Sequence, residues 1–504
     1  MKIFQTHQIR EIDSITIQEE PIESFQLMKR ASRCFFEKLL PYLDHSEHIA
    51  ILAGSGNNGG DALVIANLLD IIGQPISIYL VNPKNQLSND CQKAYTELSR
   101  NCTIQTVQTA EEISFENASI IIDGLFGSGL NRPLEGTYRS IVDKINQSGC
   151  KVFSIDIPSG LFGEDNTVNH HEHIVNATYT FTFQTPKPCF FFAENEKPLG
   201  KWEVLDIHLH PKAIDNTQTP YYLTEEEEVK KMVHVRGKFS HKGTFGHALL
   251  ISGSYGMMGA SILATKAALR TGCGLVTTHI PQKGYEIMQI SVPEAIVSLD
   301  KSETHFTGTP DLNKYNVIGI GPGLGTNEES MDAFHQTLLN YQHPMVIDAD
   351  ALNLLGKDTS WWEKIPQGSI LTPHPKEFER ICGEKTTAYQ SWVKQIELSQ
   401  RYKVIIVLKG AYSSISLPDG SLHINPTGNS GMATAGSGDT LTGIITSLLA
   451  QSYKPEEAAI LGTWLHGKAG DLALMKNSEE SLIASDIIQE IGTVYKNLHS
   501  TESK

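Results

Sequence analysis

The stretch Asn429–Gly443, "NSGMATAGSGDTLTG", places four glycines, two alanines and one carboxylate directly ahead of the apolar run "IITSLLA". A glycine-rich turn that leads into a helix leaves backbone N–H groups free at the helix N-terminus, where they can bind an anion. Asp439 puts a negative charge at the same place. The helix dipole favours a carboxylate there by roughly 0.3–1 kcal/mol, so Asp439 is either a helix cap or a functional group.

Length and composition limit the classes of protein that need to be considered. A chain of 504 residues predicts two or three domains. The net charge of −16 argues against a nucleic-acid or anionic-membrane partner, and no apolar run approaches the roughly 18 residues of a membrane span. Arg10, Glu11 and Asp13 lie where a signal peptide would be apolar, and the seven cysteines include no C-x-x-C pair. We therefore expect a cytosolic, cytoplasmic globular protein with reduced thiols.

The chain alternates short apolar runs with amphipathic helical stretches. Runs such as "HIAILAG" (48–54) and "HALLISG" (247–253) are continuously apolar rather than alternating. That pattern indicates a parallel sheet covered by helices on both faces. A proline-rich and polar stretch at 208–232 interrupts the pattern and is predicted as a linker. The expected fold class is α/β, with two domains at 1–215 and 222–504.

In open α/β sheets, ligands bind at the carboxyl ends of the strands, so the loops after the strands are informative. In "ILAGSGNNGGDALVIANLL" (51–69), Gly54, Gly56 and Gly59 satisfy G-x-G-x-x-G between a strand and a helix. This favours a dinucleotide phosphate, although a tight strand–helix turn is the alternative. The next strand ends in Asn82 and Pro83 without an acidic residue for a ribose, which disfavours a redox dehydrogenase.

Two further strand ends add polar groups to the same edge of the predicted sheet. Asp123 ends one strand and is followed by a glycine loop that carries Arg132, a cation suited to phosphate. Asp156 and Ser159 follow the next strand. Asn58, Asp123 and Ser159 together offer oxygen ligands to a hard cation, whereas each of them alone would be typical of a turn or a helix cap.

The motifs "NNGGD", "DGLFGSGLNRP" and "DIPSG" resemble the epimerase domain of bifunctional NAD(P)H-hydrate repair enzymes, over most of 1–210. Ala62 departs from the family pattern, in which glycine is usual. The resemblance implies a Rossmann-like doubly wound domain that interconverts the R and S hydrates of NADH and NADPH. It implies potassium ligands at Asn58, Asp123 and Ser159. It implies substrate contacts at Asn57, Asn58, Gly59, Gly60, Asp61, Gly127, Ser128, Gly129, Leu130, Asn131, Arg132, Pro133, Tyr138 and Asp156.

The second half carries its own set of loops after predicted strands. Gly253–Gly259 is a glycine-rich turn between a strand and a helix, and "GIGPGLG", "TPHPKEFERICG" and "VLKGAY" follow other strands. With "TAGSGDTLTG" they resemble the ribokinase-like fold of small-molecule kinases. In that fold the G-x-G-D turn holds nucleoside phosphates, and its Asp takes a proton from the attacking hydroxyl.

More narrowly, "HKGTFG", "GMMGA", "GPGLG", "TPHPKEFERICG", "LKG" and "NSGMATAGSGDTLTG" are similar to the nucleotide-dependent NAD(P)H-hydrate dehydratases over about 235–490. The resemblance implies that the chain restores NADH and NADPH from their hydrates, with ADP or ATP as phosphoryl donor and Mg²⁺. It implies hydrate contacts at Ala260, Gly323, His374 and Asp439. It implies nucleotide contacts at Lys409, Gly410, Ala411, Tyr412, Ser413 and Gly438.

The chemistry of the hydrate defines roles for two carboxylates. The hydrate carries a hydroxyl at C6 of its nicotinamide ring. Hydroxide is a poor leaving group, so this hydroxyl must first be phosphorylated. Asp439 is the predicted base for that step. Epimerisation at C6 needs a proton donor and acceptor, for which Asp156 is the candidate. A ribokinase-like kinase of a vitamin precursor and a non-enzymatic NAD(P) sensor are the rival functions. We also expect a homo-oligomer.

Overall fold

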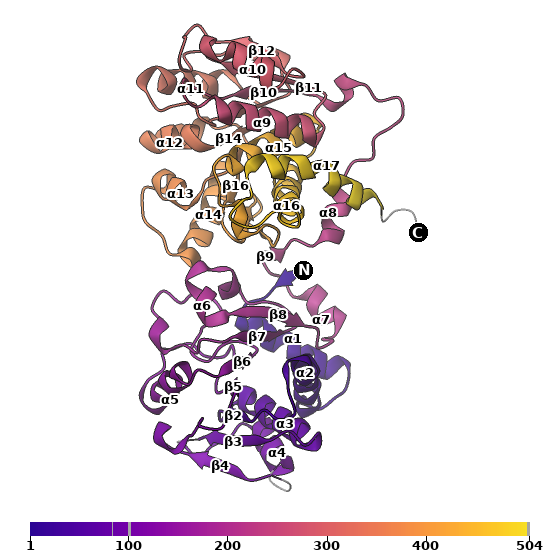
Figure 1. The fold of residues 1–504 in the computed structure, drawn as a ribbon, viewed down its shortest axis with the longest axis vertical. Coiled ribbons are helices and arrows are strands. Elements are labelled where there is room, and N and C mark those ends of the chain that lie inside the picture. The colour runs from indigo at the N-terminus through magenta and orange to yellow at the C-terminus, as the bar shows by residue number, and fades with distance from the viewer. Residues whose placement is uncertain (83, 99–101, 501–504) are drawn as a thin grey trace. The chain divides into compact units, whose positions relative to one another are not determined.

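The computed structural model describes residues 1–82, 84–98 and 102–500. The chain forms two compact units, Lys2–Thr219 and Pro220–Lys504 together with Met1 (Figure 1). Each unit is a mainly parallel sheet flanked by helices, which confirms the predicted α/β fold class. Pro83, used above in the sequence argument, and the last residues of the second predicted domain lie outside the described residues.

The sheet of the N-terminal unit runs in the order β4-β3-β2-β5-β6-β7-β8, and all its strand pairs are parallel. The chain leaves β2 toward β3 on one side and returns to β5 on the other, so the carboxyl ends of β2 and β5 form a topological switch point. The strands are β2 (Ile49–Ala53), β3 (Ile76–Val81), β4 (Ile104–Val107), β5 (Ile120–Gly124), β6 (Lys151–Ile155), β7 (Tyr179–Phe183) and β8 (Lys201–Leu205), with a short β1 (Lys2–Ile3) near the N-terminus.

Successive residues of the central strand β2 bury opposite faces of this sheet. Ile49 and Ile51 pack in one apolar core with helices α2 and α3, while Ala50 and Leu52 pack in a second core with α5. Both faces are therefore covered, which explains why the strand is continuously apolar. The helices of this unit are α1 (Thr6–Glu19), α2 (Ser24–Leu39), α3 (Asn57–Ile71), α4 (Asn89–Leu98), α5 (Gly136–Gln147), α6 (Glu196–Leu199) and α7 (Pro211–Asn216).

The C-terminal unit has a separate sheet, whose strands lie in the order β9-β18-β17-β16-β15-β14-β13-β10-β11-β12. The pairs from β16 to β12 are parallel, and β16, β17 and β18 form an antiparallel meander. The strands are β9 (Tyr221–Leu223), β10 (His247–Ile251), β11 (Leu275–Ile280), β12 (Ile296–Leu299), β13 (Val317–Ile320), β14 (Met345–Ile347), β15 (Ile370–Leu371), β16 (Ile405–Leu408), β17 (Ser413–Ser416) and β18 (Leu422–Asn425).

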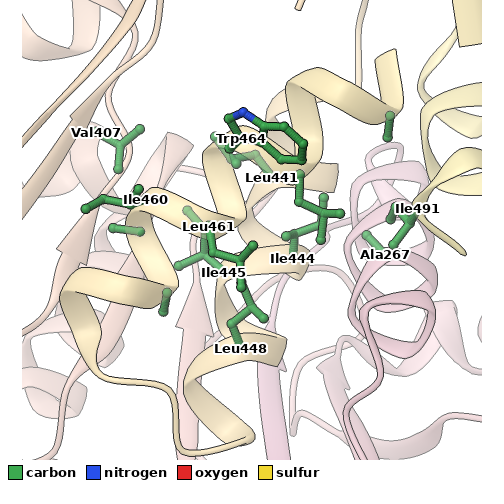
Figure 2. Close-up of a cluster of buried hydrophobic side chains, with 14 of the residues drawn as sticks. Ala267, Val407, Leu441, Ile444, Ile445, Leu448, Ile460, Leu461, Trp464 and Ile491 are labelled. Atoms are coloured by element: carbon green, nitrogen blue, oxygen red, sulfur yellow. The ribbon is translucent and has the colours of Figure 1, made fainter. Parts of the chain in front are cut away.

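The largest core of this unit surrounds the helix that follows the glycine-rich turn of the opening stretch. Figure 2 shows Leu441, Ile444, Ile445 and Leu448 of α15 beside apolar side chains of α16. None of the helices in the described part of the chain is long and apolar enough to cross a membrane. The helices of the unit are α8 (Glu226–Met232), α9 (Met258–Thr271), α10 (Tyr285–Ser291), α11 (Glu328–Asn340), α12 (Ala349–Lys357), α13 (Pro375–Cys382), α14 (Ala388–Tyr402), α15 (Ser437–Ala450), α16 (Pro455–Leu474) and α17 (Ala484–Ser500).

The stretch 208–232 differs from the expected linker because it contains regular structure. Helix α7, strand β9 and helix α8 all lie within it, and β9 pairs with β18 of the C-terminal sheet. Several of its residues therefore belong to helix starts: Pro211 begins α7, and the glutamates precede and begin α8. The division between the two units falls after Thr219.

We expect each unit to fold by itself, because each has its own cores and its own set of strand-end loops. Since residue 215 lies inside α7 and residue 222 inside β9, the test uses fragments 1–219 and 220–504. Both fragments should give cooperative thermal unfolding, and only the second should need nucleotide for activity. An insoluble or molten second fragment, or nucleotide-dependent repair by the first, would contradict this division of the chain.

Candidate active sites

The first predicted site begins at the turn between β2 and α3. A Cβ atom at Gly59 would lie 1.8 Å from the carbonyl oxygen of Gly54, so only glycine permits this approach of helix and strand. At the helix start, Asn57 Oδ1 accepts a hydrogen bond from Ser88 Oγ at 2.8 Å. The Asn58 side chain is buried, and its amide nitrogen has no hydrogen-bond partner within the described residues. An unpartnered buried amide indicates room for a ligand at this point.

Asp61, predicted as a substrate contact, points into the interior of the unit. Its Oδ1 accepts a hydrogen bond from Ser32 Oγ of α2 at 2.9 Å. Burial raises the pKa of the Asp61 carboxyl well above its ordinary value, and the carboxylates of Asp156 and Asp13 raise it further. Burial disfavours the charged form of a carboxyl group, and the hydrogen bond from Ser32 opposes that effect.

Asp123 and Ser159 are in direct contact at the ends of β5 and β6. Ser159 Oγ donates to Asp123 Oδ1 at 2.6 Å, and Ser159 N donates to Oδ2 at 2.8 Å. The hydroxyl of Ser154 and the backbone N–H of Leu125 supply two more hydrogen bonds to the same carboxylate. Burial raises the pKa of Asp123, whereas these hydrogen bonds favour its ionised form. The group is thus a buried, rigidly held set of oxygen atoms.

The loop after β5 brings the remaining predicted contacts toward these groups. A Cβ atom at Gly127 would lie 3.4 Å from the side chain of Asn58, so the predicted cation ligands and the glycine loop are neighbours. The guanidinium of Arg10 on α1 lies 2.7 Å from the corresponding position of Gly129. The ring of Tyr138 packs against Phe126 at 4.6 Å. The other residues of the loop are half-buried or exposed: Ser128, Leu130, Asn131, Arg132 and Pro133.

Asp156 lies directly after β6 in a conformation that is uncommon for a residue with a side chain. Its φ is 65°, in the left-handed region. Asp156 Oδ1 accepts hydrogen bonds from Thr182 Oγ1 at 3.2 Å and from Phe183 N at 3.1 Å. The same oxygen pairs with the ammonium of Lys187, whose side chain is 1% exposed. The conformation is therefore held by several contacts with β7 and the loop after it.

Two charged residues near Asp156 were not anticipated from the sequence. Lys187 lies in "QTPKPCF", and Asp13 lies on α1 within the charged N-terminal stretch. Burial raises the pKa of Asp13 to about 6; the charge of Asp156 raises it as well, and that of Lys187 lowers it. Asp13 lies on a helix, away from any strand end. Lys187 lies in the loop after β7 (Tyr179–Phe183), so the strand-end criterion that selected Ser159 would have found it.

The second predicted site is built on the N-terminus of α15. Gly436 precedes the helix with a φ of 89°, which favours glycine, and the helix starts at Ser437. Asp439 is half-buried on the first turn, and its carboxylate accepts no hydrogen bond from the described residues. A helix cap would bond the backbone N–H groups, so this geometry does not support the capping alternative. Burial and the charges of Asp348 and Asp350 raise the pKa of Asp439 to about 6, against the effect of Lys409.

Lys409, predicted to bind nucleotide, is the cation at the centre of this site. Its Nζ lies 2.9 Å from Asp348 Oδ1 and 3.8 Å from Glu377 Oε2. A Cβ atom at Gly438 would lie 3.4 Å from the same ammonium, so the lysine reaches the first turn of α15. Burial by itself would lower the pKa of Lys409, but these carboxylates raise it above its usual value. The arrangement presents an ammonium and helix N–H groups together, which suits a phosphate.

His374 lies at the start of α13, beside the same group of charges. Its Nδ1 accepts a hydrogen bond from Lys376 N at 3.2 Å, and its Nε2 lies 3.3 Å from Glu377 Oε1. Burial and the charge of Lys409 lower the pKa of His374. Burial also raises the pKa of Glu377. Because Nδ1 of His374 accepts a hydrogen bond, Nε2 carries the proton in the neutral ring and can donate to Glu377.

The last two predicted hydrate contacts, Ala260 and Gly323, lie side by side. A Cβ atom at Gly323, in the loop after β13, would be 3.1 Å from the Cβ of Ala260 on the first turn of α9. Ser254 Oγ fixes this loop by donating to Gly323 O at 2.9 Å. Residues Gly410–Ser413 form a tight turn between β16 and β17, closed by the Ser413 hydroxyl on Gly410. Ala411 is exposed, and Tyr412 is half-buried.

Three residues of this site were missed. Asp348 holds Lys409 and also accepts a hydrogen bond from Thr442 Oγ1 at 2.6 Å. Its position after the apolar run "PMVIDAD" is a strand end, so the criterion that selected Asp123 would have found it. Glu377 belongs to "TPHPKEFERICG", which was recognised only as a motif. Burial lowers the pKa of His466 to about 4, and its Nε2 lies 3.3 Å from Ser437 Oγ. His466 lies inside the apolar helix α16, where a core histidine is the ordinary interpretation.

Fold and sites together define a two-unit α/β enzyme, with a Rossmann-like unit and a ribokinase-like unit that places a carboxylate at a helix N-terminus. Residues 24–189 match the model of the YjeF-related protein N-terminus, and residues 248–492 match that of NAD(P)H-hydrate dehydratase. The chain belongs to the family of bifunctional NAD(P)H-hydrate repair enzymes.

Relatives of this family match along almost the whole chain. The bifunctional NAD(P)H-hydrate repair enzyme of Moorella thermoacetica is 32% identical, over 99% of this chain and 97% of its own length. That of Coxiella burnetii is 32% identical, over 97% of this chain and 98% of its own. Among solved structures, the ADP/ATP-dependent NAD(P)H-hydrate dehydratase of Bacillus subtilis, co-crystallised with ATP/Mg²⁺, is 31% identical over 55% of this chain and 98% of its own, with a TM-score of 0.48.

Proposed function

We propose that the chain repairs hydrated NADH and NADPH. The N-terminal unit interconverts the R and S hydrates, and the C-terminal unit returns the S hydrate to NADH or NADPH with ADP or ATP. The observation that carries the second activity is Asp439, a carboxylate with a pKa of about 6 and no hydrogen bond from the described residues, at the N-terminus of α15. A general base with a pKa near the working pH is effective, and this one lies beside a phosphate-binding arrangement.

The dehydration follows from the proposed roles of these groups. Asp439 takes the proton of the C6 hydroxyl, and the hydroxyl oxygen forms a bond to the terminal phosphorus of the nucleotide as the remaining nucleotide leaves. The electron pair of the ring nitrogen then expels phosphate from C6, and loss of the proton at C5 restores the nicotinamide double bond. Lys409 and the N–H groups of Ser437 and Gly438 stabilise the charge on the transferred group.

Magnesium would enter this site together with the nucleotide phosphates. Asp348 and Glu377, two buried carboxylates within 4 Å of the Lys409 ammonium, are the residues whose oxygen atoms suit it. When bound, Mg²⁺ supplies neutralisation of the charge on the phosphates. The protein's own groups hold the proton at Asp439 and orient the nucleotide through Lys409.

The proposed role of Asp156 is proton exchange with the C6 hydroxyl. Inversion at C6 requires opening either the C6–O bond or the C6–N1 bond, and both routes need a proton donor and acceptor near the hydroxyl. In the ring-opening route, Asp156 takes the hydroxyl proton, the oxygen forms a carbonyl with C6, and the C6–N1 electron pair moves to the ring nitrogen. Rotation and reclosure then reverse both transfers with the opposite face of C6 exposed.

The direct test incubates the full chain with acid-hydrated NADH and either ADP or ATP, while the near-ultraviolet absorbance of the dihydronicotinamide is followed. We expect the absorbance to recover only with nucleotide. The recovered amount should exceed the amount of S hydrate present at the start, because the R hydrate is converted to S. Failure to restore absorbance, with phosphorylation of hydroxymethylpyrimidine instead, would favour the rival kinase function. Binding of the hydrate without turnover would favour a sensor.

We propose that potassium is the cation of the N-terminal site. Carboxylate, hydroxyl and amide oxygens suit a hard cation, and the side chain of Asn58 lies beside the glycine loop after β5. Asn58, Asp123 and Ser159 would hold it. A monovalent ion polarises a bond weakly, so its contribution is to order the loop that contacts the substrate.

Replacing potassium with tetramethylammonium should therefore raise the epimerase KM by about tenfold, or ~1.4 kcal/mol of binding, with a smaller effect on kcat. Initial rates at several hydrate concentrations measure this, and the slow uncatalysed epimerisation must be subtracted. The dehydratase rate in the same samples serves as the control. An unchanged KM in the absence of potassium would contradict the cation site.

The remaining partners and the location are also proposals. The small-molecule partners are the hydrates NADHX and NADPHX and the nucleotide. All seven cysteines are free thiols, which supports a reducing compartment, and we propose the cytoplasm. A homo-oligomeric state is retained as an expectation, and multi-angle light scattering measures it.

A further inference from the structure

A buried lysine lies beneath the proposed base of the N-terminal unit. The side chain of Lys187 is 1% exposed, and its ammonium contacts Asp156 Oδ1, Thr182 Oγ1 at 2.7 Å, Thr185 O at 3.4 Å and Phe183 O at 3.5 Å. Each of its N–H groups therefore has an acceptor inside the protein. A lysine so placed cannot reach a bound hydrate, and any effect on the reaction must act through Asp156.

The two oxygens of the Asp156 carboxylate are in different situations. Oδ1 accepts hydrogen bonds from Thr182 Oγ1 and Phe183 N as well as the contact with Lys187. Oδ2 receives no hydrogen bond from any residue in 1–82, 84–98 or 102–500. The side chain is 13% exposed. The carboxylate is thus fixed through one oxygen, and the other is available to an incoming group.

The backbone of Asp156 makes this arrangement specific. The φ of 65° lies in the left-handed region, which is unfavourable for residues other than glycine. Asp156 would leave this conformation if no contacts held it. The backbone N–H of Asp156 donates to Phe181 O at 2.9 Å, and its carboxylate is tied to Thr182 and Phe183 on the same segment. Lys187 closes the set from the loop after β7. The carboxyl groups of Asp13 and Asp61 are close enough to interact with Asp156, and Lys187 is the cation that interacts with both Asp13 and Asp156.

We infer that Lys187 is a positioning residue for epimerisation: its buried ammonium fixes the Asp156 carboxylate through Oδ1 and leaves Oδ2 free to exchange a proton with the hydrate. The inference rests on the proposed function of Asp156 and adds the residue that makes it an oriented base. The proton moves only between the C6 hydroxyl oxygen and Oδ2, and Lys187 keeps its own protons throughout.

The test compares Lys187→Met, Lys187→Arg and the control Lys197→Met in the full chain. Lys197 is exposed in the same unit and forms no ion pair with a described residue. We expect Lys187→Met to lower the epimerase kcat by roughly 10²-fold with a KM within about threefold of wild type, since Lys187 does not touch substrate. Lys187→Arg keeps the charge and should retain a larger part of kcat. Lys197→Met should resemble wild type.

Two further measurements keep the inference falsifiable. If Lys187→Met fails to fold, Thr182→Val removes the hydroxyl that bonds both Asp156 Oδ1 and Lys187 Nζ, and it should lower kcat by about tenfold. A wild-type kcat in folded Lys187→Met or in Thr182→Val would overturn the inference. A rise of KM in these variants as large as the fall of kcat would overturn it as well. A wild-type rate in Asp156→Ala would instead remove Asp156 from the reaction, which distinguishes failure of the proposed function from failure of this inference.

Discussion

Replacing Asp439 with Asn should lower nucleotide-dependent dehydration by roughly 10²–10⁴-fold and leave the interconversion of R and S hydrates unchanged. Asn keeps the size and shape of the side chain but cannot accept the hydroxyl proton. The structure makes the two interpretations of this residue separable, because an N-cap would tolerate Asn well. Initial rates with purified S hydrate and saturating nucleotide provide the measurement.

The matched control is Asp332→Asn, which changes an exposed carboxylate on α11 that is not part of the predicted site. Turnover of Asp439→Asn within a few-fold of this control would contradict the assignment of the base. The pH dependence offers a second check. Since the pKa of Asp439 is about 6 and the ionised form is the active one, wild-type dehydration should fall as the pH drops through about 6 and level off above it.

The second large effect is expected for Asp156→Ala, which should abolish R-to-S conversion above the uncatalysed rate. Dehydration of the S hydrate by the same protein should continue at the wild-type rate, because the C-terminal unit has its own site. With a mixture of hydrates, absorbance should recover quickly until the S hydrate is consumed. It should then rise only at the rate of uncatalysed epimerisation.

Asp215→Ala, an exposed position on α7, is the control for the same unit. If Asp156→Ala still equilibrates the two hydrates at the wild-type rate, Asp156 has no part in the reaction. Chiral separation of the hydrates during the first turnovers gives this answer without interference from dehydration, provided nucleotide is omitted.

Much of the fold was predictable because parallel strands and their loops leave local signals. Continuous apolar runs identified β2 and β10, and the rule that ligands bind at strand ends selected Asp123 and Asp156. The same rule placed Asp439 after a glycine turn, where the structure has it at the start of α15. These predictions depend only on residues that are close in the sequence.

The parts that were missed depend on contacts between distant segments. Lys187 meets Asp156 across 31 residues, and Asp348 meets Lys409 across 61. Lys187 follows a strand in the sequence, but its burial and its pairing with Asp156 come from the packing of the loop after β7. The stretch 208–232 resembles a linker in sequence because it is rich in proline and polar residues, and its elements are too short to show periodicity. Their pairing and packing, rather than their propensity, make them regular.

The unbonded carboxylate of Asp439 has a consequence for the folding equilibrium. A carboxyl whose pKa rises from 3.8 to about 6 on folding loses on the order of 3 kcal/mol of stability once it is fully ionised. That stability is present below the unfolded pKa and is lost as the pH rises through about 6, the range in which the base becomes active. The residue needed for turnover thus lowers the stability of the folded protein without ligand. Asp439→Asn, although inactive, should unfold at a higher temperature than wild type near neutral pH, and the difference should vanish in acid.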